Sequence, residues 1–251
     1  MKRISMILAT LVALTGCKIE DAEYFDPTRN GYLMFLPANA CLADAAADAA
    51  RLIQFNEYYS VSGEERKMLH DRYFYSSRIV DSGNDEWRII DCNGELVVRT
   101  GGRTLGEEGA TWRYAYAGRD YAENVWPTIA CRKSGLDTFY DLELPGQARL
   151  SFTAAFYDRP QENGMTRYWC ELRIEGSGLC PEHRDGYGAG EVGCEIVEPL
   201  KYLSDRPRSF DAGKLKLTTQ TNNKTYEAEA EYGAHEHVSI SYGQYKNYYW
   251  Y

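Results

Sequence analysis

The chain has 251 residues, of which 44% are hydrophobic and 26% are charged. These values are ordinary for a folded domain and exclude a disordered protein. The formal net charge is −9, and no cluster of Lys and Arg interrupts it. This balance argues against nucleic-acid binding, which needs cations to neutralise phosphates.

The first seventeen residues have the organisation of an export signal. Met1-Lys2-Arg3 is positively charged, and an apolar run from Ile4 to Ala13 follows, which is too short to span a bilayer. The next residues, Leu14-Thr15-Gly16-Cys17, resemble the lipobox of bacterial lipoproteins. The resemblance implies cleavage before Cys17, which then carries a thioether-linked diacylglycerol and usually an N-acyl chain. We expect residues 1–17 to be signal peptide and lipobox, and the lipid bilayer to be a partner through acylated Cys17. An ordinary secretory signal is the alternative.

An acidic tether is predicted over residues 18–32. Glu20, Asp21 and Glu23 resemble the surface-export signals of lipoproteins from Bacteroidetes, whose uncharacterised members share this size and strand-rich pattern. The resemblance implies a lipid-anchored protein of the outer membrane and leaves open whether it faces the periplasm or the surface. Charge that keeps a solvated tether extended is the alternative explanation. Turn signals at Asp26-Pro27 and Asn30-Gly31 are expected to end the tether.

Two helices are predicted next. Asn39 is the expected N-cap of an alanine-rich helix that continues through about Tyr58. Ser62 and Glu65 have the spacing of a capping box at the start of a second helix. Its expected buried stripe consists of Met68, Leu69 and Tyr73. Because the connection between the helices is short, they should form an antiparallel hairpin.

From Arg78 onward the pattern changes to strands, and the 21 tyrosines of the chain suit such positions. Glu86–Cys92 and Glu95–Thr100 flank Asn93-Gly94, a strong hairpin signal. A short strand at Arg103–Leu105 is expected to follow. Further strands are predicted at 110–117, 148–156, 168–174, 192–196, 214–220, 225–232 and 237–242.

These elements predict an α+β protein that is mainly β, with an N-terminal helical hairpin packed on antiparallel β-meander sheets. Residues 33–251 would form this helical hairpin and β domain. Two sub-domains that divide near Gly118 remain the alternative.

Six cysteines remain beyond Cys17, and an exported protein is permitted disulfides. Cys170 and Cys194 both lie among residues that are expected to face inward, so a bridge between them is the preferred pairing. Buried free thiols are the competing interpretation. No close pair of cysteines has the spacing of a zinc site, and we predict neither a metal nor a cofactor.

Several motifs have better structural explanations than functional ones. Residues 188–193 spell G-x-G-x-x-G, but no strand precedes them and no helix follows, as a dinucleotide site requires. His235 and His237 share a strand face without identifiable further ligands, and Ser177 does not lie in a hydrolase elbow. The terminal rings are expected to pack into a sheet, and they comprise Tyr245, Tyr248, Tyr249, Trp250 and Tyr251.

The sequence does not identify catalytic residues. The leading hypothesis is a membrane-anchored, non-enzymatic binding or interaction protein with an unknown glycan or protein ligand. An envelope hydrolase that acts on glycan or peptide is the second hypothesis, and it would require converging carboxylates or a His beside a nucleophile in a pocket. A structural component of an envelope complex is the third, and it would require an extensive exposed apolar surface.

Overall fold

The computed structural model describes residues 27–92, 94–118, 125–162, 164–180, 190–203, 210–221, 224–233, 237–243 and 245–250. Side chains are described for all of these residues except 27–34, 180, 221, 224, 237, 245 and 247–250. The two described helices are α2, Pro27–Tyr59, and α3, Gly63–Tyr73. The strands are β1 Arg78–Gly83, β2 Glu86–Asp91, β3 Gly94–Arg99, β4 Thr111–Tyr116, β5 Thr128–Ser134, β6 Asp137–Leu144, β7 Ala148–Pro160, β8 Thr166–Cys180, β9 Gly190–Leu203, β10 Phe210–Thr221, β11 Lys224–Gly233, β12 His237–Tyr242 and β13 Tyr245–Trp250.

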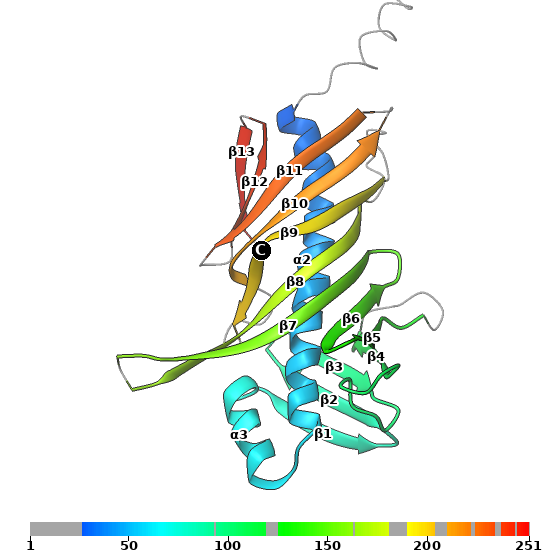
Figure 1. Ribbon diagram of the computed structural model, residues 1–251, viewed down its shortest axis with the longest axis vertical. Coiled ribbons are helices and arrows are strands. Elements are labelled where there is room, and N and C mark those ends of the chain that lie inside the picture. Colours follow the sequence, from blue (N-terminus) through cyan, green and yellow to red (C-terminus); the bar gives the residue numbers. More distant parts are fainter. Residues whose placement is uncertain are drawn as a thin grey trace, which may run out of the picture.

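The described strands form a single antiparallel meander in which each strand pairs with the next along the chain, from β1 to β13. Figure 1 shows that α2 runs along this twisted sheet and crosses many of its strands. The predicted class is therefore confirmed: the protein is mainly β, with two helices before the sheet and the first of them packed on it. The sheet continues from β4 to β5 through the pairs Thr111–Ala130 to Arg113–Thr128, across the position near Gly118.

Alternating side chains explain why these segments form a sheet with one buried face. In β4, Trp112, Tyr114 and Tyr116 are all buried, as the alternation predicts. The hairpin expected at Asn93-Gly94 is also confirmed, because Asp91 pairs with Gly94 and Gly94 has a φ of 115°. Only glycine adopts this backbone conformation readily.

Alanine-rich sequence lets α2 approach the sheet closely. Ala38, Ala45, Ala46 and Ala49 are completely buried. At Gly178 of β8 an added Cβ would lie 2.6 Å from the carbonyl oxygen of Ala38, so the helix rests directly on the strand there. Larger side chains at both ends of this contact fill the core, among them Phe35, Leu42, Leu52 and Phe55.

The start of α2 differs from the prediction. The helix begins at Pro27, so Asn30-Gly31 lies within it rather than in a turn, and Asn39 is not an N-cap. Asn39 is buried in the helix–sheet interface, where its Oδ1 accepts a hydrogen bond of 2.7 Å from the hydroxyl of Tyr232. A polar residue that resembles a cap therefore serves as an internal acceptor, because the apolar face continues through Phe35 and Ala38 on its N-terminal side.

The helical hairpin is confirmed, but the second helix is less buried than predicted. Ser62 occupies the N-cap position of α3 without a side-chain capping bond, and Glu64 and Glu65 lie in the first turn, where they favour the helix dipole. Met68 is 60% exposed, and Tyr73 is the buried residue of this helix. The hairpin is held by Tyr73 and by Arg66, whose guanidinium donates a 3.2 Å hydrogen bond to the carbonyl oxygen of Tyr59 and lies over the ring of Tyr58.

Residues 103–105 do not form the predicted strand. Instead, the backbone N–H of the buried Leu105 donates a 2.7 Å hydrogen bond to Oδ1 of Asn56 on α2. The helix thus supplies the partner that a neighbouring strand would have supplied. Within the described residues, no helix is both long and apolar enough to cross a membrane.

Candidate functional site

The face of the sheet that points away from α2 is polar. Cross-strand ion pairs cover β10 to β13, with distances of 2.8 Å for Lys214–Glu229, 2.8 Å for Lys216–Glu227 and 3.0 Å for Lys246–Glu231. Exposed pairs of this kind contribute little to stability. They keep this face solvated.

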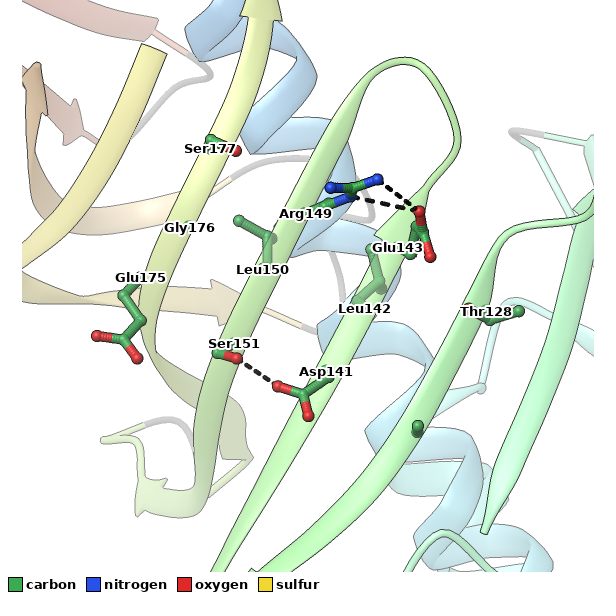
Figure 2. A pocket seen from close by; sticks show the side chains of 11 residues that line it. Thr128, Asp141, Leu142, Glu143, Arg149, Leu150, Ser151, Glu175, Gly176 and Ser177 are labelled. Carbon is green, nitrogen blue, oxygen red and sulfur yellow. Dashed lines mark hydrogen bonds and ion pairs between the residues drawn. The ribbon is translucent and has the colours of Figure 1, made fainter. Parts of the chain in front are cut away.

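A shallow hollow of about 590 Å³ lies on the outer face over β5 to β8, and we call it the outer groove. It is lined by Thr128, Ala130, Asp141, Leu142, Glu143, Arg149, Leu150, Ser151, Glu175, Gly176 and Ser177. Figure 2 shows that Asp141 and Glu143 project from β6, Arg149 and Ser151 from β7, and Glu175 and Ser177 from β8. A second hollow of about 590 Å³ adjoins it and shares Gly176 and Ser177.

Residues with small side chains at paired positions of neighbouring strands leave the space that forms the outer groove. Ser151 pairs with Asp141 and Glu175, and Ser177 pairs with Arg149 and Gly193. Gly176 allows the strands to approach here, because it has a φ of 151° and an added Cβ would lie 2.0 Å from the carbonyl oxygen of Arg149. A larger residue at this position would force β7 and β8 apart.

The acidic side chains of the outer groove are held by neighbours. The hydroxyl of Ser151 donates to Asp141, and Arg132 Nε donates to the same carboxylate over 3.3 Å. Arg149 pairs with Glu143 at 3.2 Å. In the adjoining hollow, the hydroxyl of Ser177 donates to Glu191. The groove therefore presents oriented hydroxyls, carboxylates and a guanidinium on an open surface, which suits hydrogen bonding to a polar ligand.

The predicted disulfide between Cys170 and Cys194 is wrong, because both residues are free thiols. Cys194 pairs with Gly176 across β8 and β9, and Gly176 lies six residues from Cys170 along β8. Six residues of strand span about 20 Å, much too far for a bridge. Burial raises the pKa of the Cys170 thiol, and burial raises the pKa of Cys194 to about 12. Both behave as small apolar residues, which was the competing interpretation.

The remaining predicted features are only partly described. Cys17 and His235 lie outside the described residues, as does Tyr251. Gly190–Gly193 belongs to β9, so a strand follows the glycines rather than the helix of a dinucleotide site. Among the described residues, no group of three or more His, Cys, Asp or Glu could hold a metal. Tyr245, Tyr248, Tyr249 and Trp250 belong to β13, whose backbone pairs with β12.

Sequence reasoning missed the outer groove because it missed β5 and β6. Asp141, Glu143, Arg149 and Ser151 carry no motif, and only strand register brings them together. The sequence did contain one signal for β6, because the turn glycines Gly135 and Gly146 stand on either side of it. Their φ values are 64° and 69°. Comparison of the chain with protein-family models, with curated proteins and with solved structures found no match.

Proposed function

We propose that this chain is a lipid-anchored envelope protein of the outer membrane whose folded body binds a polar ligand. The anchor rests on the lipobox resemblance at Cys17, and two or three acyl chains would hold the body stably at a bilayer. The ligand class that fits best is a glycan, with a protein segment as the alternative.

The open outer groove is the observation that carries the binding proposal. Its hydroxyls and carboxylates are fixed by neighbours on the strands, as in the pairs Ser151–Asp141 and Arg149–Glu143. Rigid strands hold these groups in a constant arrangement, so little conformational entropy is lost when a ligand binds. Sugar hydroxyls both donate and accept hydrogen bonds, and this mixed lining matches them.

The other two hypotheses have less support. A hydrolase needs a pocket that shields its reacting groups from water, and the outer groove is an open surface. A structural component would present a broad apolar face. The large exposed apolar residues of the described chain are instead spread over separate elements, and they include Met68, Val125, Leu136, Met165, Leu179 and Val197.

A glycan array tests the proposal with the full chain in detergent. Thr128 of β5 lines the outer groove and is partly exposed, so Thr128→Tyr places a ring in the groove. Val197→Tyr on β9 is the matched control, because Val197 is 50% exposed and does not line either hollow.

We expect the wild-type chain and V197Y to retain a common set of glycans, and T128Y to bind them at least about tenfold more weakly, the equivalent of about 1.4 kcal/mol. Retention of a protein from envelope extract that T128Y abolishes would support the protein alternative. Measurable turnover of a cell-wall or glycan substrate by the chain would overturn the binding proposal.

A further inference from the structure

Among the described residues, part of strand β7 has an edge with which no strand pairs. β6 pairs with β7 only from Leu144–Ala148 to Tyr140–Phe152. Beyond that point, Thr153 to Pro160 pair with β8 alone, and Asp137 to Phe139 pair with β5 alone. Figure 1 shows β7 and β8 extending as an arm that diverges from β6. We call the stretch Thr153–Pro160 the β7 edge.

The hydrogen-bond pattern identifies which backbone groups this edge presents. Leu179 N–H donates to Gln147 and Gln161 N–H donates to Met165, so odd-numbered residues of β7 are the ones that bond to β8. Antiparallel pairs alternate between bonded and non-bonded. The N–H and C=O groups of Ala154, Phe156 and Asp158 therefore point away from β8, toward the side that β6 has left.

The first five residues of the β7 edge lack the features that usually prevent strand addition, and only its last three, Asp158, Arg159 and Pro160, carry charge or proline. Exposed edges are normally protected by charges, prolines or bulges. β1 has such features, since it carries Arg78 and Asp81 and its register is irregular between Asp81 and Gly83. The five residues from Thr153 to Tyr157 have the sequence TAAFY, carry no charge and contain neither proline nor glycine. Such a stretch accepts another strand readily.

A carboxylate without a cation lies on the inner side of this edge. The side chain of Glu57 on α2 is half-buried, and it forms no ion pair or hydrogen bond within the described part of the chain. Its charge acts on Tyr140 of β6, Tyr73 of α3 and Cys170 of β8, and Cys170 pairs directly with Phe156. Glu57 is therefore near residues of β6, α3 and β8 that adjoin the β7 edge, where Cys170 pairs with Phe156 and the ring of Tyr73 lies 5.6 Å from that of Phe156.

Aromatic rings surround the same place. The ring of Tyr73 lies 5.6 Å from that of Phe156, and the ring of Tyr140 lies 5.4 Å from that of Phe152. Aromatic faces and a carboxylate together favour an alkylammonium or guanidinium group, through cation–π contact and ion pairing. This charge complementarity indicates that a binding partner would place a lysine or arginine side chain there.

We propose that the β7 edge binds an extended peptide of another protein as an added strand, and that an inward-facing lysine or arginine of this peptide reaches Glu57. The site is separate from the outer groove, so either can fail without the other. Main-chain bonds to Ala154, Phe156 and Asp158 provide affinity, and the cation at Glu57 provides specificity.

Two synthetic peptides test the proposal by fluorescence anisotropy with the full chain in detergent. The first has seven residues of alternating threonine and valine around a central lysine, and the second has glutamate in place of that lysine. We expect the lysine peptide to bind at least about tenfold more tightly than the glutamate peptide. Methylation of alternate backbone nitrogens should abolish its binding, because it removes the donors of an added strand.

Variants separate the two parts of the site. Glu57→Gln should weaken the lysine peptide about tenfold, whereas Glu171→Gln should leave it unchanged, because Glu171 pairs with Ala155 on the opposite face. Asp158→Pro removes an N–H that points outward and leaves the bonds to β8 intact, so it should weaken both peptides. Asp158→Ala keeps that N–H and should bind as the wild type does.

The proposal is overturned if the two peptides bind equally, if the methylated peptide binds as well as its parent, or if Asp158→Pro matches Asp158→Ala. Sedimentation provides a second contradiction. A dimer of the full chain that Asp158→Pro dissociates would show that a second copy, rather than a peptide, occupies the edge.

Discussion

Asp48 is a buried carboxyl group whose charge state affects the stability of the fold. It faces β4 from α2 and accepts a 2.7 Å hydrogen bond from the hydroxyl of Tyr116. Burial raises the pKa of Asp48 from 3.8 to about 6, partly offset by the hydrogen bond from Tyr116 and by Arg51, while Asp44 adds to the rise. The folded state therefore holds a proton that the unfolded chain releases at lower pH.

This raised pKa gives a pH dependence with a definite sign. Because folding favours the protonated form, its stabilising effect is complete below about pH 4 and is lost as the pH rises through 6. The loss is of the order of 3 kcal/mol. Asp48→Asn should remove this part of the pH dependence. The measurement is urea unfolding at pH 4.5 and 7.0, and an unchanged difference between wild type and variant at the two pH values would refute the assignment.

Gly178 is the residue at which the helix and the sheet are closest. Gly178→Ala would place a Cβ 2.6 Å from the carbonyl oxygen of Ala38 and 2.9 Å from Leu42 Cγ, so helix or strand must move. We expect a loss of about 1–3 kcal/mol in the free energy of unfolding. Gly193→Ala is the matched control, because its nearest contact is 3.6 Å, and it should be nearly neutral. Equal effects in thermal unfolding would contradict the close packing.

Single residues were predicted well where alternation is clear and poorly where a polar residue is buried. Val238 and Ile240 are buried on one face of the strand predicted at 237–242, but Ser239 on its other face is also only 3% exposed. Asn39 and Asn56 were missed as acceptors for Tyr232 and Leu105. Sequence patterns give the polarity of a residue and do not show whether a distant segment will provide its partner.

At the scale of elements, α2 is fastened to the sheet by buried polar contacts as well as by apolar packing. Arg51 forms a buried ion pair with Asp91 at the end of β2, and its Nη1 has no hydrogen-bond partner within the described residues. Removal of one partner leaves a buried charge without compensation. Arg51 therefore fixes the position of the helix against β2 at a considerable desolvation cost.

A double-mutant cycle measures this contribution. Arg51→Met alone should cost about 3–5 kcal/mol, because Asp91 stays buried without its cation. The combination of Arg51→Met with Asp91→Leu should recover most of this loss. Chemical denaturation of the four proteins provides the values, and strictly additive effects would show that the two side chains are not coupled.

The strands that were predicted are those in which apolar and polar residues alternate without interruption. Ala148, Leu150 and Phe152 in β7 and Cys170, Leu172 and Ile174 in β8 are buried in register. β5 and β6 escaped notice because the inward residues Ile129 and Cys131 are followed at once by Arg132 and Lys133. The local pattern predicted a strand at Arg103–Leu105. In the structure the backbone N–H of Leu105 donates its hydrogen bond to Asn56 on α2 instead of to a neighbouring strand.

For the whole molecule, the sequence predicts the order of helices and strands and not their curvature. The position of α2 along many strands depends on the twist of a long meander, which accumulates from strand to strand. The outer groove and the β7 edge arise from register and from the separation of β6 and β7. Neither carries a motif, so both emerge only when the strands are paired.

The proposed anchored location depends on one covalent modification, and detergent-phase partitioning measures its consequence. Cys17→Ser should move the protein from the detergent phase to the aqueous phase, because the body exposes a polar face and loses its acyl chains. Lys18→Ala is the matched control next to the modified position and should partition as the wild type does.

The most direct test of the central proposal is the mass of the amino-terminal peptide of the protein isolated from its native membrane. An anchored lipoprotein predicts a peptide that begins at Cys17 and carries the added mass of a diacylglycerol and an acyl chain. A peptide that begins at Met1, or an unmodified Cys17, would contradict the anchor and with it the proposed location.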